Sequence, residues 1–275
     1  MGNFIDQLDK AIDRNNSLLC IGLDSDIGKL PAQFKNCRQP QLEFNKAIIE
    51  ATAPFVSSYK INSAFYEATG ADGIAQLKLT MDYLKQHYPN LPVILDAKRA
   101  DIGNTNGGYI DFAFKYLKAD AITLHPYLGG EALQPFLNLK DKGMIILCRT
   151  SNPGSGQFQD LIVDGQPVYQ AVAHQVVSSW NTNGNCMLVV GATYPQEMAS
   201  IRRIVGPDMP LLVPGIGAQG GDLEPVMAAG LGAGRRGLII HSARGIIFAS
   251  SGSDFAEVAA QKATELRDQI NQLRK

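Results

Sequence analysis

Eight short apolar runs recur along the whole 275-residue chain, and helical periodicity fills most of the intervals between them. Near-continuous apolar strands of this kind suit a parallel sheet that is buried on both faces. Eight evenly spread strand–helix units favour a closed (β/α)8 barrel, or TIM barrel, over the competing open, doubly wound sheet. The predicted strands are Leu18–Asp24, Ser57–Ile61, Val93–Lys98, Ala121–His125, Met144–Arg149, Met187–Gly191, Leu211–Pro214 and Leu238–His241.

Two further helices are expected at the ends of the chain. The apolar positions within Phe4–Ile12 predict an extra N-terminal helix ahead of the first strand. The last helix opens on Asp254-x-x-Glu257, a spacing typical of a capping box. Since no linker divides the chain, we predict a single barrel domain over residues 1–275.

Charge and cysteine content restrict the partners and the cellular compartment expected for the chain. The 25 Lys plus Arg residues nearly balance 26 Asp plus Glu residues, so no global field favours nucleic acid or membrane, and any anion site must be local. No CxxC pair occurs, and most of the cysteines lie in or beside apolar runs, which favours a reducing compartment. The polar, acidic N-terminus is unlike a signal peptide, and no apolar run approaches membrane-spanning length. We therefore expect a cytoplasmic protein.

Polar and charged residues gather at the predicted carboxyl ends of the strands. In parallel α/β barrels this end carries the active site, because the βα loops meet there. Any one of these charged residues, taken alone, is better explained by a structural salt bridge, but several at one mouth indicate a functional site. His125 and His241 are consistent with core histidines as well as with ligands. The charged or polar strand ends are Asp24, Lys60, Asp96, Lys98, His125, Arg149, Gln219 and Arg244.

The sharpest feature is the run from Asp96 to Asp101. Residues two apart on a strand point to the same side, so Asp96 and Lys98 can both face the barrel mouth. Asp101 lies past the strand end, where a loop can aim it inward or toward a neighbour. A lysine held between carboxylates stays protonated and firmly placed, which suits a proton donor. The alternative is a structural ion pair, but burying three charges without a functional need is costly.

A glycine-rich run, Val213–Asp222, follows the seventh strand and indicates a phosphate site. Its glycines let backbone N–H groups approach a ligand closely, and Arg244 after the eighth strand offers a forked donor. Gly215–Gly220 also matches a dinucleotide-binding pattern, but it lacks the acidic residue expected about 20 residues later. The segment 152–166 is long for a βα loop, which indicates either a mobile segment or one that covers the site. Arg235–Arg236 is expected in a solvated loop.

At Asp96–Thr105 (DAKRADIGNT) the sequence closely resembles the orotidine 5′-phosphate decarboxylases, specifically their longer bacterial branch. The combination of motifs is highly specific, although D-x-K-x-x-D alone is shared with related sugar-phosphate barrels. The resemblance implies cofactor-independent, metal-free decarboxylation of orotidine 5′-phosphate to UMP and CO2, the last step of de novo UMP biosynthesis. It continues at Asp24, Lys60–Glu67, Ser151–Gly154, Val213–Asp222 and Ser242–Gly245.

The resemblance also implies catalytic roles and an assembly. Lys98 would deliver a proton to C6 of the pyrimidine, and Asp96 would lie beside the departing carboxylate. Lys60 would complete the charge array and hold the ribose. Asp101 and Thr105 would reach the ribose of a partner subunit, in a homodimer whose active sites are shared across the interface.

The remaining residues implied by the resemblance bind substrate. Asp24 would hold ribose hydroxyls, Ser151 would touch the pyrimidine, and Gln219 and Arg244 would bind the phosphate. The full set of expected substrate-binding residues is Asp24, Lys60, Asn62, Thr105, Ser151, Pro214, Gln219, Gly220 and Arg244.

Two other functions fit a barrel of this kind. A metal-dependent sugar-phosphate lyase or aldolase, such as a hexulose-phosphate synthase, would need extra carboxylates at the strand ends, and no convincing set is present. A non-catalytic phosphosugar-binding barrel would need Arg244 and Gln219 but not the array of Asp96, Lys98 and Asp101.

Overall fold

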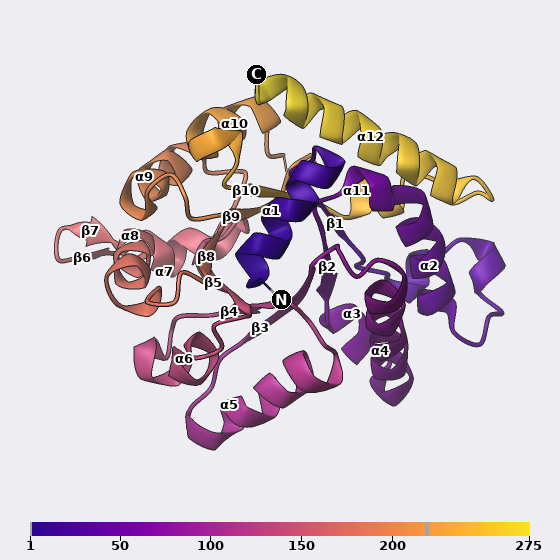
Figure 1. Cartoon of the computed structure of the whole chain (residues 1–275), viewed down its shortest axis with the longest axis horizontal. Coiled ribbons are helices and arrows are strands. Elements are labelled where there is room, and N and C mark those ends of the chain that lie inside the picture. Colours follow the sequence, from indigo (N-terminus) through magenta and orange to yellow (C-terminus); the bar gives the residue numbers. More distant parts are fainter. Residues whose placement is uncertain (1, 218–219) are drawn as a thin grey trace.

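The computed structural model describes residues 2–217 and 220–275, and within them eight parallel strands form a closed barrel (Figure 1). The barrel order β1-β10-β9-β8-β5-β4-β3-β2 confirms the predicted fold class, and every predicted strand agrees with an observed one to within two residues at either end. The strands are β1 Leu19–Gly22, β2 Ser58–Asn62, β3 Val93–Arg99, β4 Ala121–Leu124, β5 Gly143–Arg149, β8 Cys186–Val190, β9 Leu211–Pro214 and β10 Leu238–Ser242.

Helices surround the barrel, as Figure 1 shows, and one small hairpin, β6 with β7, lies in the long segment after β5. The strands alternate with these helices because each parallel pair needs a crossover connection. The helices are α1 Phe4–Asn15, α2 Pro40–Thr52, α3 Ala64–Glu67, α4 Gly70–His87, α5 Gly103–Ile110, α6 Gly129–Leu137, α7 Gly156–Gln159, α8 Val168–Gln175, α9 Pro195–Val205, α10 Leu223–Gly230, α11 Arg244–Ile247 and α12 Phe255–Leu273, and the hairpin strands are β6 Ile162–Val163 and β7 Gln166–Pro167.

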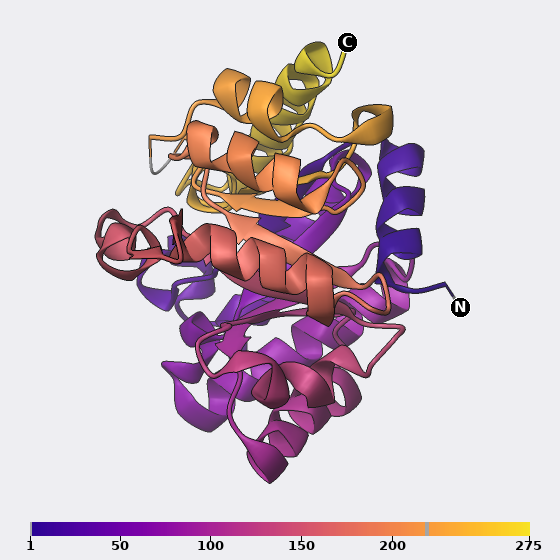
Figure 2. The ribbon, with the colours of Figure 1, turned by 90° about the vertical axis from the view of Figure 1, so that its left-hand side faces the viewer.

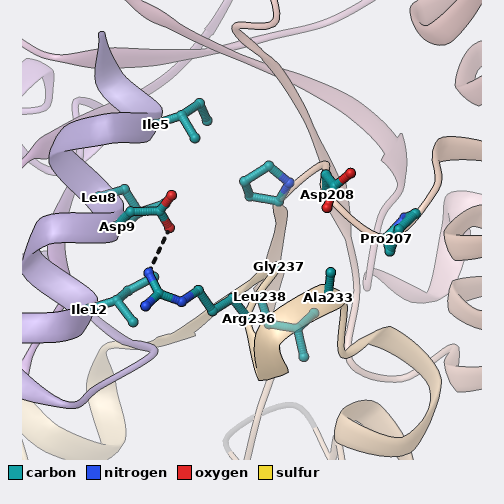
Figure 3. Close-up of a pocket in the computed structure, with 11 residues that line it drawn as sticks. Ile5, Leu8, Asp9, Ile12, Pro207, Asp208, Ala233, Arg236, Gly237 and Leu238 are labelled. Carbon is teal, nitrogen blue, oxygen red and sulfur yellow. Dashed lines mark ion pairs between the residues drawn. The ribbon is translucent and has the colours of Figure 1, made fainter. Parts of the chain in front are cut away.

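The predicted N-terminal helix is α1, and it lies against the amino-terminal ends of the barrel strands. Figure 2 shows α1 on one side of the barrel and the segment with β6 and β7 on the other. Between α1 and the starts of β9 and β10 remains a cavity of about 220 Å³ (Figure 3). Arg236 crosses its edge and pairs with Asp9 at 3.4 Å and with Asp13. The Arg235–Arg236 loop is solvated, as expected, and the partly exposed side chain of Arg236 also ties α1 to the barrel.

The capping box predicted for the last helix is not formed. Asp254 precedes α12 with φ −84° and ψ 5°, and its side chain caps no backbone N–H. Its Oδ1 instead accepts a hydrogen bond from Ser250 Oγ at 2.6 Å. An extended backbone is what lets an N-cap side chain turn back onto the helix, and Asp254 lacks it. Packing holds this end in place, because Phe255 stacks against the buried ring of Phe44 at 5.4 Å.

Among the described residues, none of the helices combines the length and the apolarity that a membrane crossing requires.

Candidate active site

A cavity of about 430 Å³ opens at the carboxyl ends of the strands, where the sequence predicts the site. It brings together residues from most of the barrel strands and from the loop after β5. Seven of the predicted site residues line it: Asp24, Lys60, Asn62, Asp96, Lys98, Ser151 and Pro214. The other lining residues are Thr123, Leu147, Thr150, Asn152, Gln159, Val189, Leu212 and His241.

Lys60 lies between two carboxylates at the bottom of this cavity. Its Nζ is 2.9 Å from Asp96 Oδ2 and 3.3 Å from Asp24 Oδ1, and its side chain is only 4% exposed. Burial alone would lower the pKa of Lys60, but the charges of Asp96 and Asp24 outweigh it and raise the pKa above its ordinary value. Lys60 therefore stays an ammonium ion at neutral pH.

Lys98 contacts the other oxygen of the same carboxylate, with its Nζ 2.6 Å from Asp96 Oδ1. Its side chain is 49% exposed and so reaches toward the open part of the cavity. Burial works to raise the pKa of Asp96, but Lys60 and Lys98 together lower it well below its ordinary value. Among the described residues of one chain, Lys60 is the lysine held between two carboxylates, whereas Lys98 pairs with Asp96. A second carboxylate beside Lys98 would have to come from a neighbouring chain.

The backbone at Lys98 departs from a regular strand. Its φ is +47°, and the register between β3 and β4 shifts between Leu95 and Arg99. A non-glycine residue in the left-handed region is costly and persists only where its surroundings hold it. Here the backbone N–H of Lys98 donates to Thr123 Oγ1 at 2.9 Å, and that hydroxyl donates to Asp96 Oδ1 at 2.9 Å. The bulge and Thr123 together aim Lys98 into the cavity beside Asp96.

Asp101 and Thr105 do not line the cavity of their own chain. Asp101 Oδ1 accepts a hydrogen bond from the backbone N–H of Ile102 at 2.7 Å, and its backbone is held by Asn106. Thr105 is exposed on α5, close in sequence to Ile102, which is 60% exposed. Neither residue therefore contributes to the cavity of its own chain.

The expected phosphate end is open. Pro214 lines the cavity, Gly220 is exposed with φ +82°, and Gln219 lies outside the described residues. Arg244 opens α11 and is exposed, and its guanidinium makes no hydrogen bond or ion pair with the part of the chain that the structure describes. The guanidinium of Arg244 is thus available to an anion.

Several lining residues were not among the predicted site residues. Thr123 is a polar residue inside an apolar strand, and that was the only signal for it in the sequence. His241, weighed as either a core histidine or a ligand, is buried and borders the cavity. Burial lowers the pKa of His241 well below its ordinary value, and the charge of Lys60 lowers it further, so its imidazole is neutral. Gln159 and Asn152 come from the long segment 152–166 after β5, whose length was the signal in the sequence that it could cover the site.

The comparisons with known proteins agree with this geometry. Residues 17–259 match the family described as "Orotidine 5'-phosphate decarboxylase / HUMPS family". The orotidine 5'-phosphate decarboxylase of Cellvibrio japonicus is 51% identical over 271 residues, which cover 98% of this chain and 98% of that protein. The chain belongs to the orotidine 5'-phosphate decarboxylase family.

Other members of the family agree in sequence and in fold. The decarboxylase of Ralstonia pickettii is 49% identical over 271 residues, covering 98% of this chain and 99% of that protein. The structure of Leishmania donovani OMP decarboxylase superposes with a TM-score of 0.85 and 38% identity over 99% of this chain and 98% of that one. Leishmania donovani UMP synthase gives a TM-score of 0.88 and 41% identity, and this chain, covered completely, spans 57% of it.

Membership of this family makes the chain a carboxy-lyase of the decarboxylation step in UMP biosynthesis. The cavity agrees with that step, since it holds two ammonium groups and two carboxylates in contact. Within the described residues no group of three or more His, Cys, Asp or Glu side chains could hold a metal ion, so the ligand set that the alternative lyase requires is not found there.

Proposed function

We propose that orotidine 5′-phosphate binds in this cavity with C6 of its pyrimidine beside Lys98 and its carboxylate beside Asp96. The observation that carries the proposal is the row of alternating charges Asp24, Lys60, Asp96 and Lys98, in which each ammonium lies within 3.3 Å of a carboxylate. Charges fixed in this way before substrate arrives need little reorganisation during the reaction.

The reaction itself needs one bond to break and one to form. The C6–carboxylate bond breaks, CO2 leaves, and the electron pair remains on C6. The ammonium of Lys98 then donates a proton to C6, which gives UMP, and Lys98 regains a proton from water. No electrons are gained or lost overall. We therefore propose that the decarboxylase works without a metal or an organic cofactor.

The sizes of the interaction energies decide which residue contributes most to lowering the activation barrier. Two like charges about 4 Å apart repel by roughly 4 kcal/mol at an effective dielectric of 20. Enzymes of very slow reactions must lower the barrier by roughly 20 kcal/mol or more. Repulsion between Asp96 and the substrate carboxylate is therefore too small to be the main contribution. Stabilisation of the developing carbanion by Lys98, together with binding energy from the phosphate, supplies most of the remainder.

The rest of the substrate extends from this centre to the open end of the cavity. Asp24 and Lys60, joined by Asn62, hold the ribose, and Ser151 contacts the pyrimidine. The phosphate lies at the glycine-rich turn after β9. Its binding residues are Pro214, Gln219, Gly220 and Arg244.

We further propose that the whole chain works as one barrel domain in a cytoplasmic homodimer. The placement of Asp101 and Thr105 supports this assembly, since neither lines its own cavity and both contact exposed Ile102. In the dimer these residues complete the partner's site at the ribose.

The activity is tested by following the absorbance of orotidine 5′-phosphate with purified protein. Turnover that survives exhaustive chelation supports the proposal. Turnover that is lost on chelation and returns with a divalent ion contradicts it and favours the metal-dependent lyase.

A further inference from the structure

Arg149 is the last residue of β5, and its side chain is almost completely buried, at 3% exposed. It does not line the active-site cavity, yet the residues that follow it do: Thr150, Ser151, Asn152 and Gln159. An arginine is rarely buried without several partners, because its charge cannot be neutralised by losing a proton. The contacts of the Arg149 guanidinium therefore indicate why this side chain is buried.

One edge of the guanidinium donates hydrogen bonds to three residues of the loop that follows β5. Nη2 donates to Asp160 Oδ2 at 3.1 Å, and Nη1 donates to Gln159 Oε1 at 3.3 Å and to Ser155 Oγ. All three acceptors belong to the segment Thr150–Asp160. The loop thus closes on itself around one side chain, which holds together the two short helical turns Pro153–Ser155 and Gly156–Gln159 that the segment contains.

The flat face of the same guanidinium contacts the neighbouring loop. Its Cζ lies 3.6 Å from the centroid of the Tyr194 ring, in the turn after β8. The two loops also touch directly, since Thr193 Oγ1 donates to the backbone oxygen of Ser151 at 3.4 Å. The fit there is tight: a Cβ on Gly191 would lie 2.7 Å from Ser151. Arg149 therefore joins two loops at the place where Ser151 enters the cavity.

Gln159 connects this cluster to the cavity itself. Its Oε1 accepts from Arg149 and also from the backbone N–H of Thr150 at 2.9 Å, and its side chain lines the cavity. Arg149 is thus one hydrogen bond away from the cavity wall. A lysine at this position would offer one point charge, without the planar fork or the stacking surface that the contacts use.

We propose that Arg149 is a positioning residue for decarboxylation. It holds the segment Thr150–Asp160 against the turn after β8, so that Ser151 and Gln159 stand in place at the pyrimidine end before substrate binds. This inference rests on the proposed function, which places the pyrimidine beside Ser151. Misplacement of a site by about 1 Å can cost on the order of 100-fold in rate, so an effect of that size is expected on losing the anchor.

The test compares Arg149→Met and Arg149→Lys with wild type. We measure kcat and KM for orotidine 5′-phosphate, and the affinities for UMP and for ribose 5-phosphate, which lacks the pyrimidine. Both variants should lose on the order of 100-fold in kcat/KM and bind UMP more weakly, while ribose 5-phosphate binds as in wild type. Arg149→Lys should not recover the loss, because a lysine cannot reproduce the fork.

Arg236→Met serves as the matched control, since it removes the arginine that pairs with Asp9 (Figure 3) and lines the cavity beside α1 instead of the active-site cavity. It should leave kcat/KM unchanged even where it lowers the melting temperature. Should Arg149→Met fail to fold, Tyr194→Leu removes only the stacking face and should show the same pattern, with about a tenfold loss.

The outcomes distinguish a failure of the role proposed for Arg149 from a failure of the proposed function. An active wild type with kcat/KM unchanged in the folded variants overturns the role of Arg149, as does an equal weakening of UMP and ribose 5-phosphate binding. A wild type without turnover of orotidine 5′-phosphate overturns the proposed function instead.

Discussion

Lys60 Nζ and Asp96 Oδ2 lie 2.9 Å apart inside the barrel mouth, with side chains that are 4% and 11% exposed. Taking such charges out of water is expensive, and the cost is met only while both partners remain. Asp24 on the other side of Lys60 and Lys98 on the other side of Asp96 extend the pair into a row of four charges. The stability of the folded chain and the arrangement for catalysis therefore depend on the same contacts.

Replacing Lys60 tests this dependence. Lys60→Met leaves Asp24 and Asp96 buried without the cation between them, and breaking a buried pair in this way costs about 3–5 kcal/mol. Urea unfolding measures the loss. Lys29→Met, which breaks the exposed pair with Asp26, is the control and should cost no more than about 1 kcal/mol. Similar losses in the two variants would contradict the account.

Subunit mixing tests whether Asp101 completes the partner's site. Asp101→Ala and Lys98→Ala homodimers should each be nearly inactive, but mixed dimers contain one site that is wholly wild type. Activity should therefore return after the two proteins exchange subunits, toward about a quarter of wild type for random pairing of equal amounts. Verified exchange without recovery of activity would show that the sites are not shared.

Arg244 is expected to act at a distance from the reacting carbon. By binding the phosphate, Arg244 would hold the glycine-rich loop closed. Binding energy at the phosphate end of the substrate would then lower the activation barrier at the pyrimidine end. Arg244→Ala should reduce kcat/KM for orotidine 5′-phosphate severely but change little with orotidine, which has no phosphate. Equal losses for nucleotide and nucleoside would mean that Arg244 supports the fold.

His241 makes stability depend on pH. Burial and the charge of Lys60 lower its pKa in the folded state, with Lys98 opposing protonation and Asp96 favouring it. Below the unfolded value of about 6.5, the unfolded chain takes up a proton that the folded chain refuses, so stability falls with falling pH by up to about 1.4 kcal/mol per pH unit. Urea unfolding from pH 7 downward should show a shallower fall in His241→Asn. Equal slopes would count against the buried neutral imidazole.

The strands were predictable because their signal is local. A buried parallel strand is apolar throughout, so Cys186–Val190 and Leu211–Pro214 stand out without reference to the rest of the chain. The partners of individual side chains were less predictable than the strands. Alternation places Asp96 and Lys98 on one side of a strand, but the bulge and positive φ at Lys98 have no signal in the residues themselves.

Contacts between segments that lie far apart in the sequence were also not predictable from it. Lys60 gains its second carboxylate from β3, a strand away, so nothing near it in sequence showed that it, rather than Lys98, is held on both sides. The ion pairs of Arg236 with α1 had no signal in the sequence, because its partners lie more than 200 residues earlier. For Asp254, propensity indicated a cap, but the turn before α12 directed its carboxylate to Ser250.

The most direct test of the account is Lys98→Ala, assayed for turnover of orotidine 5′-phosphate and for binding of UMP. The lysine interacts chiefly with the developing carbanion, so the account predicts that kcat nearly vanishes while UMP still binds. A folded Lys98→Ala protein that keeps most of the wild-type kcat would contradict it, because another group would then be delivering the proton to C6.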